Sequence, residues 1–349
     1  MKTIKAYLTV FRAKNLAIIA LTMYLMRWGI LKPFAEVHQL ESQITELNFF
    51  LLVLSVVFVA AGGYLINDYF DLKIDRINKP EKIVVGRFIK RRVAIVLNWV
   101  LNAFGFFIGF YVSYTIGLWQ LCFIHLFLIF SLWFYSTEFK RQLIIGNFII
   151  SMAVALVPFT VALYEIPALE FYYAPKIIKI AQDYAEVDQK IKIEIGETLM
   201  ELDEDPRVAY AKFRRNLFYW ILAFSGFAFL LSFSREITKD AADIEGDETF
   251  RCKTIPIVFG LKNTKIIVSI IYLLVIGLLI TAQQMFLKDK WTFLYVIVLL
   301  VPMLIFAMIS TIMANNQLGF QRASTINKLA SVIGILYAVL AHYLISGIA

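Results

Sequence analysis

Two groups of aspartates with the same spacing are the residues of this sequence most able to do chemistry. The first group is Asn67, Asp68, Asp71 and Asp75, and the second is Asp240, Asp243 and Asp247. Both contain the pattern D-x-x-D-x-x-x-D. Because offsets of three and seven residues return to nearly the same side of a helix, each group would line one helix face if the helix continues through it.

Oxygen ligands of this kind predict a divalent cation together with a phosphate-bearing substrate. Each group follows an apolar stretch, and an even number of apolar stretches separates the two groups, so both emerge on the same side of a membrane. Two clusters of negative charge would repel each other there unless a positive group lies between them. Mg²⁺ prefers hard oxygen ligands and is often held by carboxylates and substrate phosphates at once. We therefore expect a metal–diphosphate between the two groups.

Two other interpretations of the aspartates compete with a metal–diphosphate site. A single D-x-x-D is more often a solvated loop beyond a helix end, but two copies at equivalent places favour a site. Acids within a membrane also mark ion or proton pathways. These acids instead cluster with Asn, Lys and Arg at the ends of spans, which favours a binding site over a transporter.

Basic residues surround both aspartate groups. A departing diphosphate needs cationic donors because negative charge builds on its oxygens. The bases near the two groups are Lys73, Arg76, Lys79, Lys82, Arg87, Lys140, Arg141, Arg235 and Lys239. Among them Arg87, Lys140 and Lys239 are the predicted diphosphate ligands, and the others are more typical of contacts with lipid headgroups.

The composition of the chain indicates which elements position these residues. Of 349 residues, 60% are hydrophobic and only 17% are charged, which excludes an ordinary cytosolic enzyme, a disordered protein and a nucleic-acid binder. Apolar runs long enough to cross a bilayer predict an all-α polytopic membrane protein with about nine transmembrane helices. The candidate spans are 15–33, 48–67, 93–114, 117–136, 143–164, 216–236, 264–285, 291–312 and 327–347.

The distribution of Lys and Arg predicts the orientation. Residues 1–14 hold four Lys or Arg and no acid, residues 33–47 hold three Glu and no Lys or Arg, and residues 71–92 hold eight Lys or Arg. The net charge of +8 is therefore attributed to the positive-inside pattern and to contacts with membrane lipids. We expect an inner-membrane protein with its N-terminus inside, and a cytoplasmic site capped by the connections 71–92 and 238–263.

One segment does not fit a compact bundle. Residues 165–215 are rich in charged residues and lack an apolar run of membrane length, so they are predicted to be a polar extracytoplasmic insert in a single domain covering 1–349. Ile177, Ile178, Ala181, Tyr184 and Ala185 recur at helical spacing, which favours an amphipathic helix. We expect a solvated connector there, with a lid or partner site as the alternative.

Taken together, these residues resemble the UbiA-type superfamily of intramembrane prenyltransferases. That superfamily carries N-D-x-x-D-x-x-x-D after its second helix and D-x-x-D-x-x-x-D after its sixth. Further matching features are Tyr135-Ser136, Gly146-Asn147, Thr254-Ile255-Pro256 and Gly260. The resemblance covers essentially the whole chain except 165–215.

The resemblance implies a mechanism and a role for each residue. Mg²⁺ would be held by Asn67, Asp68, Asp71, Asp75, Asp240, Asp243 and Asp247, and the six aspartates would be catalytic. The diphosphate would contact Asn67, Arg87, Lys140, Lys239 and Tyr135. The allylic carbon–oxygen bond would ionise, and an acceptor would capture the cation in a dry, apolar pocket.

The resemblance is closest to the branch that transfers a geranylgeranyl-type chain to a prenylated glycerol phosphate, forming an ether lipid. It rests on Asn78 and Pro80, on Arg235-Glu236-Ile237 and on Ile244-Glu245-Gly246. Lys82-Ile83 and Arg251 depart from the pattern of that branch. Prenylation of an aromatic quinone precursor such as 4-hydroxybenzoate is the alternative, and an ion-coupled transporter is a distant third. Arg12 and Arg141 are candidate ligands for the acceptor's phosphate.

Overall fold

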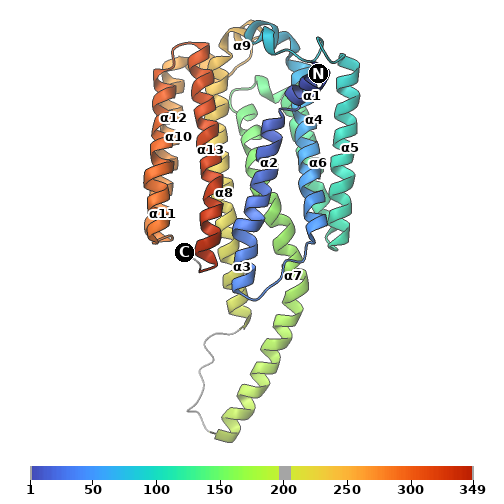
Figure 1. Ribbon diagram of the computed structural model, residues 1–349, viewed down its shortest axis with the longest axis vertical. Coiled ribbons are helices and arrows are strands. Elements are labelled where there is room, and N and C mark those ends of the chain that lie inside the picture. The colour runs from blue at the N-terminus through green and yellow to red at the C-terminus, as the bar shows by residue number, and fades with distance from the viewer. Residues whose placement is uncertain (1, 196–205, 348–349) are drawn as a thin grey trace.

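The computed structural model describes residues 2–195 and 206–347, and within these residues it is a bundle of helices without any strand (Figure 1). The helices are α1 (Lys2–Val10), α2 (Ala13–Met26), α3 (Lys32–Val37), α4 (Glu46–Asn78), α5 (Arg91–Thr115), α6 (Phe123–Thr137), α7 (Ile145–Ile195), α8 (Pro206–Ala242), α9 (Ile244–Thr249), α10 (Ile255–Met285), α11 (Lys290–Leu294), α12 (Val301–Met313) and α13 (Gln317–Ile345). Single π-helical turns join α2 to α3 and α11 to α12.

The predicted fold class is confirmed. In the described part of the chain, nine helices or joined helices are long and apolar enough to cross a membrane, and they fall on the nine predicted spans. Most extend beyond the predicted bounds, because a helix continues into the polar layer as long as its backbone stays hydrogen-bonded. The chain is an integral membrane protein.

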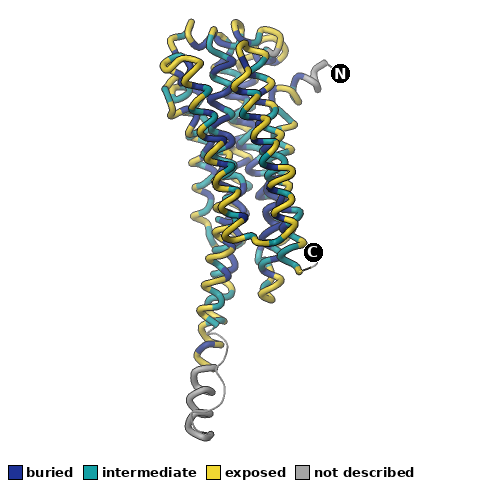
Figure 2. Tube along the Cα trace, turned by 90° about the vertical axis from the view of Figure 1, so that its left-hand side faces the viewer, coloured by how far each residue is buried: buried dark blue, intermediate teal, exposed yellow. Residues whose placement is uncertain are grey.

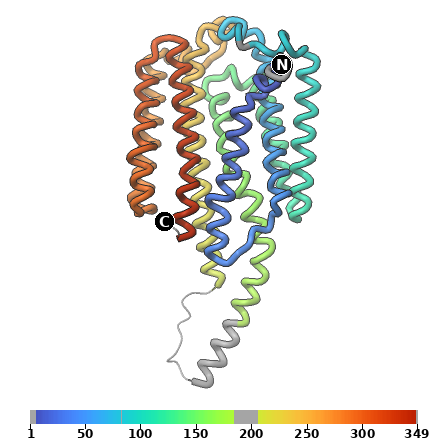
Figure 3. Tube along the Cα trace, in the orientation of Figure 1, coloured from blue at the N-terminus to red at the C-terminus, as the bar shows by residue number. Residues whose placement is uncertain are grey.

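The helices form a ring around a central space. On one side α4 packs on α5 and α6, and on the other α8 packs on α10 and α13 while α12 packs on α13. The pair α7–α8 connects the two sides, and α2 closes the ring through its contacts with α4, α7 and α13 (Figure 3). Exposed residues lie largely on the outer faces of the helices (Figure 2), where Phe104, Phe107 and Leu273 show large apolar side chains. Such side chains suit a lipid environment.

A buried arginine interrupts the first predicted span, and the structure supplies its partners. Arg27 lies in the π-helical turn after α2 with only 3% of its side chain exposed. Its Nε lies 2.8 Å from Glu165 Oε1 on α7, and its Nη1 lies 3.2 Å from Glu46 Oε2 at the start of α4. A charge inside a membrane protein is costly unless it is paired, so this network lets the first helix cross the membrane and ties it to α4 and α7.

The predicted polar insert at 165–215 begins as a continuation of α7. This helix runs without a break to Ile195, and α8 begins at Pro206, so both helices project beyond the rest of the bundle (Figure 1). The helical spacing noted at Ile177 and Ile178 accordingly falls within α7. Residues 196–205 lie outside the described part of the chain.

Candidate active site

The ring encloses a large cavity that is polar at one end and mostly apolar over the rest. Its volume is about 1930 Å³. The helix α8 lines it from Asn216 to Asp240, a length of about 36 Å at 1.5 Å per residue. The apolar part is lined by side chains such as Val56, Leu279 and Leu304. The polar end lies where α4 and α8 end, beside α9 and opposite the projecting part of α7 (Figure 1).

The first aspartate group lies on one face of α4, as predicted. This helix continues without a break to Asn78, and all four residues of the group line the cavity. Asp71 is buried, accepts a hydrogen bond of 2.7 Å from the Asn67 side chain, and pairs with Lys140. Asp68 pairs at 3.0 Å with Arg12, which follows α1.

The second aspartate group is not carried by one continuous helix, so the conditional prediction of a single helix face is wrong for it. The helix α8 ends at Ala242, and Asp243 adopts φ −108° and ψ 12° before α9 begins. Asp240 and Asp243 line the cavity, whereas Asp247 is buried in α9 and does not. Burial raises the pKa of Asp247 to about 6, although Lys140 nearby favours its charged form.

One asparagine brings the two groups together. The side chain of Asn78, at the end of α4, donates a hydrogen bond of 3.0 Å to the backbone carbonyl of Asp243. It also accepts a hydrogen bond of 2.8 Å from the backbone N–H of Gly246. A Cβ at position 246 would lie 2.5 Å from the Asn78 amide nitrogen, so only glycine allows this approach. Lys79 adds an ion pair of 2.5 Å to Asp243. The end of the first motif thus holds the turn of the second in place.

The predicted diphosphate ligands all line the cavity, but their contacts differ. Lys140 pairs with Asp71; burial opposes its charge, but Asp71 and other negative groups outweigh this and raise the pKa of Lys140. Lys239 contacts Glu236 at 2.6 Å rather than an aspartate of the second group. Arg87 lies exposed at the rim, with its guanidinium 5.2 Å from the ring centre of Phe88. Tyr135 lines the cavity beneath the aspartates.

Three residues that contact the aspartates were not among the predicted ligands of the metal or of the diphosphate. Arg12 forms an ion pair with Asp68, and Lys79 forms one with Asp243. The side chain of Asn147 donates a hydrogen bond of 2.8 Å to Asp240. Arg12 was predicted as a candidate ligand for the acceptor's phosphate, Lys79 was noted only as a basic residue near the first group, and Asn147 only as part of the resemblance. Their partners lie far away along the chain, so only the packing of the helices reveals these pairs.

The residues at the polar end fit a divalent cation that shares its ligands with a phosphate. In the described part of the chain, no three His, Cys, Asp or Glu side chains converge closely enough to hold a metal by themselves. The side-chain oxygens Asn67 Oδ1 and Asp243 Oδ1, however, are buried without a hydrogen-bond partner. Mg²⁺ needs only one or two carboxylates when phosphates and waters complete its shell. Such hard oxygen atoms on both motifs suit that shared arrangement.

Comparisons with known proteins agree with this architecture. A model of the UbiA prenyltransferase family matches residues 35–170 and 206–341. A digeranylgeranylglyceryl phosphate synthase of Methanobrevibacter smithii is 28% identical over 298 residues, covering 85% of this chain and 86% of the relative.

Solved structures of similar fold cover nearly the whole chain. The structure of a digeranylgeranylglyceryl phosphate synthase superposes with a TM-score of 0.59 at 21% identity, covering 98% of this chain and 99% of that chain. A UbiA homolog from Archaeoglobus fulgidus bound to GPP and Mg²⁺ has a TM-score of 0.52 at 15% identity, covering 96% of this chain and 99% of that chain. These two likenesses establish the fold.

Proposed function

Because the chain belongs to the UbiA prenyltransferase family, we propose that it transfers a geranylgeranyl-type group from an allylic diphosphate to a prenylated glycerol phosphate, forming an ether lipid. One observation carries the proposal: residues of both aspartate groups line the polar end of a single cavity whose remaining length is mostly apolar. A substrate with an anionic head and a long hydrocarbon tail fits such a cavity. The synthase names of the relatives support the glycerol phosphate acceptor.

The residues at the polar end are suited to holding a diphosphate. Asp68, Asp71 and Asp243 each form an ion pair with a basic side chain. The three basic residues, Arg12, Lys140 and Lys79, therefore lie where the leaving group would bind. Donors that are fixed before the reaction stabilise developing negative charge without reorganisation. In the proposed step the bond from the allylic carbon to the diphosphate oxygen breaks, the ether bond forms, and the acceptor hydroxyl loses its proton.

We propose Mg²⁺ as the cofactor, held by Asn67, Asp68, Asp71 and Asp75 on one side and by Asp240, Asp243 and Asp247 on the other. The metal would neutralise the diphosphate as it departs. The A. fulgidus homolog bound to GPP and Mg²⁺ supports this choice. Asp247 is buried in α9 outside the cavity lining, so its binding to the metal would require α9 to move.

The apolar length of the cavity is suited to the prenyl chain. Tyr219, Trp220, Phe224 and Phe227 of α8 line it, and a wall of this kind keeps water away from the reacting carbon. Exclusion of water prevents hydrolysis of a reactive cation. We therefore propose that the tail lies along α8, with the reacting end beside the aspartates.

The test of the proposed function is a product assay. The purified protein in lipid nanodiscs receives geranylgeranyl diphosphate and Mg²⁺ with either geranylgeranylglyceryl phosphate or 4-hydroxybenzoate, and products are identified by mass. We expect the ether product from the first acceptor and none after chelation of divalent metal. Transfer only to 4-hydroxybenzoate would show that the acceptor is an aromatic compound and not a glycerol phosphate. The absence of any prenylated product would contradict the proposed prenyl transfer itself.

A further inference from the structure

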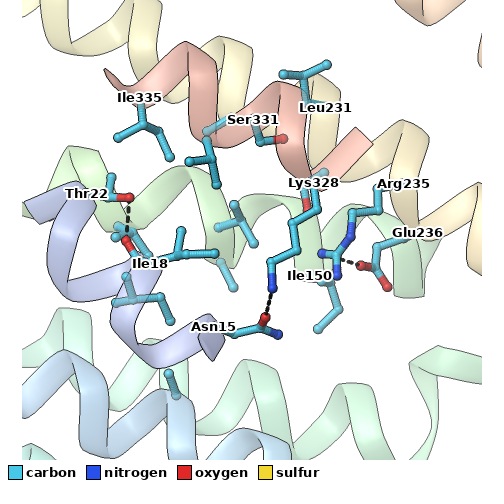
Figure 4. Close-up of a pocket in the computed structure, with 18 of the residues that line it drawn as sticks. Asn15, Ile18, Thr22, Ile150, Leu231, Arg235, Glu236, Lys328, Ser331 and Ile335 are labelled. Atoms are coloured by element: carbon cyan, nitrogen blue, oxygen red, sulfur yellow. Dashed lines mark hydrogen bonds and ion pairs between the residues drawn. The ribbon is translucent and has the colours of Figure 1, made fainter. Parts of the chain in front are cut away.

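A second group of basic side chains lies in the cavity, on the side formed by α2, α8 and α13. Arg235 of α8 and Lys328 of α13 point into the same part of the cavity, and Asn15 of α2 lies across from them (Figure 4). The Lys328 ammonium donates a hydrogen bond to Asn15 Oδ1.

This group carries more positive than negative charge. Arg235 lies 3.7 Å from the Glu236 carboxylate, and that carboxylate also contacts Lys239 at the shorter distance of 2.6 Å. Lys328 has a neutral partner in Asn15. The Nε of Arg235 is buried and has no hydrogen-bond partner among the described residues. An anionic ligand would accept a hydrogen bond from the Arg235 Nε and would neutralise the Lys328 ammonium.

The positions of both bases are set by a buried polar contact directly beside them. Asn327, which precedes Lys328, donates 2.8 Å to Ser234 Oγ, which precedes Arg235. Asn327 also donates 2.6 Å to the hydroxyl of Tyr272 on α10. Because Asn327 is fully buried, this contact fixes how α13 lies against α8. Arg235 and Lys328 therefore line the same part of the cavity because a buried hydrogen bond beside them holds α8 and α13 together.

We propose that Arg235 and Lys328 bind the anionic headgroup of the acceptor, at a subsite separate from the one that holds the diphosphate. The inference rests on the proposed prenyl transfer and adds the determinant of acceptor choice. Arg235 lies five residues before Asp240, about 7.5 Å along α8 and deeper in the cavity. An anion held there would place the remainder of the acceptor next to the aspartates. A phosphate and a carboxylate share the required chemistry, so both are tested.

The experiment compares acceptors with and without the anion. The purified protein in nanodiscs receives geranylgeranyl diphosphate and Mg²⁺ with geranylgeranylglyceryl phosphate, with its dephosphorylated alcohol, or with 4-hydroxybenzoate. The variants are Lys328→Gln, Arg235→Gln and Lys328→Arg. Lys262→Gln removes a charge from an exposed position near the start of α10 and is the matched control.

We expect each of the two neutral variants to raise the KM for the anionic acceptor by roughly tenfold, the effect of about 1.4 kcal/mol. The KM for geranylgeranyl diphosphate should stay unchanged, and the preference for the phosphorylated acceptor over its alcohol should fall by the same factor. Lys328→Arg should preserve that preference, as should Lys262→Gln. A rise in KM for 4-hydroxybenzoate, if that acceptor is used, supports the subsite with a carboxylate in it.

Other outcomes separate the two proposals. A wild-type protein that prenylates no acceptor refutes the proposed function. A wild-type protein that is active, with variants that leave acceptor KM unchanged or that weaken the alcohol and the phosphate equally, overturns only the subsite. A loss caused merely by disturbed packing would affect the charged and the uncharged acceptor alike, so the ratio between them distinguishes recognition from structure.

Discussion

At the scale of single residues, the aspartates of the two groups differ in what holds them. Asp71 is buried between Asn67 and Lys140, while Asp243 lies at the turn between two helices and pairs with Lys79. Each carboxylate thus combines a fixed position with a neighbouring cation. Removing the charge while keeping the shape tests its role directly.

Asp71→Asn and Asp243→Asn should each reduce kcat by at least about 10²-fold, since each loses a charge at the place where the leaving group is stabilised. The measurement is prenyl transfer by purified protein, with monodispersity and thermal unfolding as checks of the fold. Glu245→Gln is the matched control, because Glu245 lies between the two ends of the second motif but is exposed. Full activity in both asparagine variants would refute the two-group model.

At the scale of elements, the contact between α4 and α9 decides the distance between the two motifs. Asn78 makes the two side-chain hydrogen bonds of this contact, to Asp243 and from Gly246. Its backbone carbonyl accepts a further 2.8 Å hydrogen bond from Gln317 of α13. Three helices that are distant in sequence therefore meet at one residue.

Asn78→Ala should lower kcat and raise the Mg²⁺ concentration needed for half-maximal activity. The reason is that the second motif loses the two hydrogen bonds that fix it to the end of α4. The loss of two hydrogen bonds should also lower the free energy of unfolding by about 1–3 kcal/mol. Asn263→Ala is the control, since that side chain is exposed and bonds only within its own helix. An unaltered metal requirement in Asn78→Ala would show that α9 finds its place without this contact.

The buried pair of Arg27 and Glu165 is a second link between elements, far from the aspartates. Both side chains are almost fully buried, at 3% and 2% exposure. Arg27→Met should therefore destabilise the protein by about 3–5 kcal/mol, because an unpaired buried carboxylate remains. Thermal unfolding in detergent measures this.

Two variants make that measurement specific. Arg27→Met combined with Glu165→Leu should recover much of the lost stability. Arg214→Met breaks the pair with Glu170, whose side chains are 43% and 46% exposed, and should cost at most about 1 kcal/mol. Equal losses from the buried and the exposed pair would contradict this account of the first helix.

At the scale of the whole molecule, the polar end of the cavity lies on the side of the membrane that carries the basic connection 71–92. We propose that this side is cytoplasmic, because an excess of Lys and Arg is retained there. The two native cysteines, Cys122 and Cys252, are both buried, so an introduced cysteine can report accessibility.

Lys288→Cys, at the opposite end, should react with a membrane-impermeant maleimide in intact cells. Glu248→Cys, exposed beside the second motif, should react only after the membrane is permeabilised. The parent protein is the control for background labelling. The reverse pattern would place the aspartates outside.

Much of the fold and part of the site were predictable from sequence. Nine apolar runs must become helices, because a membrane leaves no other partner for the backbone. The spacing of Asp68, Asp71 and Asp75 implies a shared face because helical geometry is local. The insert at 165–215 was less predictable, since its charged residues conceal the continuation of α7.

The sequence by itself therefore determined the membrane class, the helices and the aspartate motifs, all of which depend on neighbours along the chain. Only the tertiary structure decided that α8 ends before Asp243, that Asp247 is buried in α9 outside the cavity lining, and which basic side chain pairs with which carboxylate. It also decided that Lys328 and Arg235 face the same part of the cavity. These outcomes depend on how helices distant in sequence pack together, and no local pattern of residues specifies that packing.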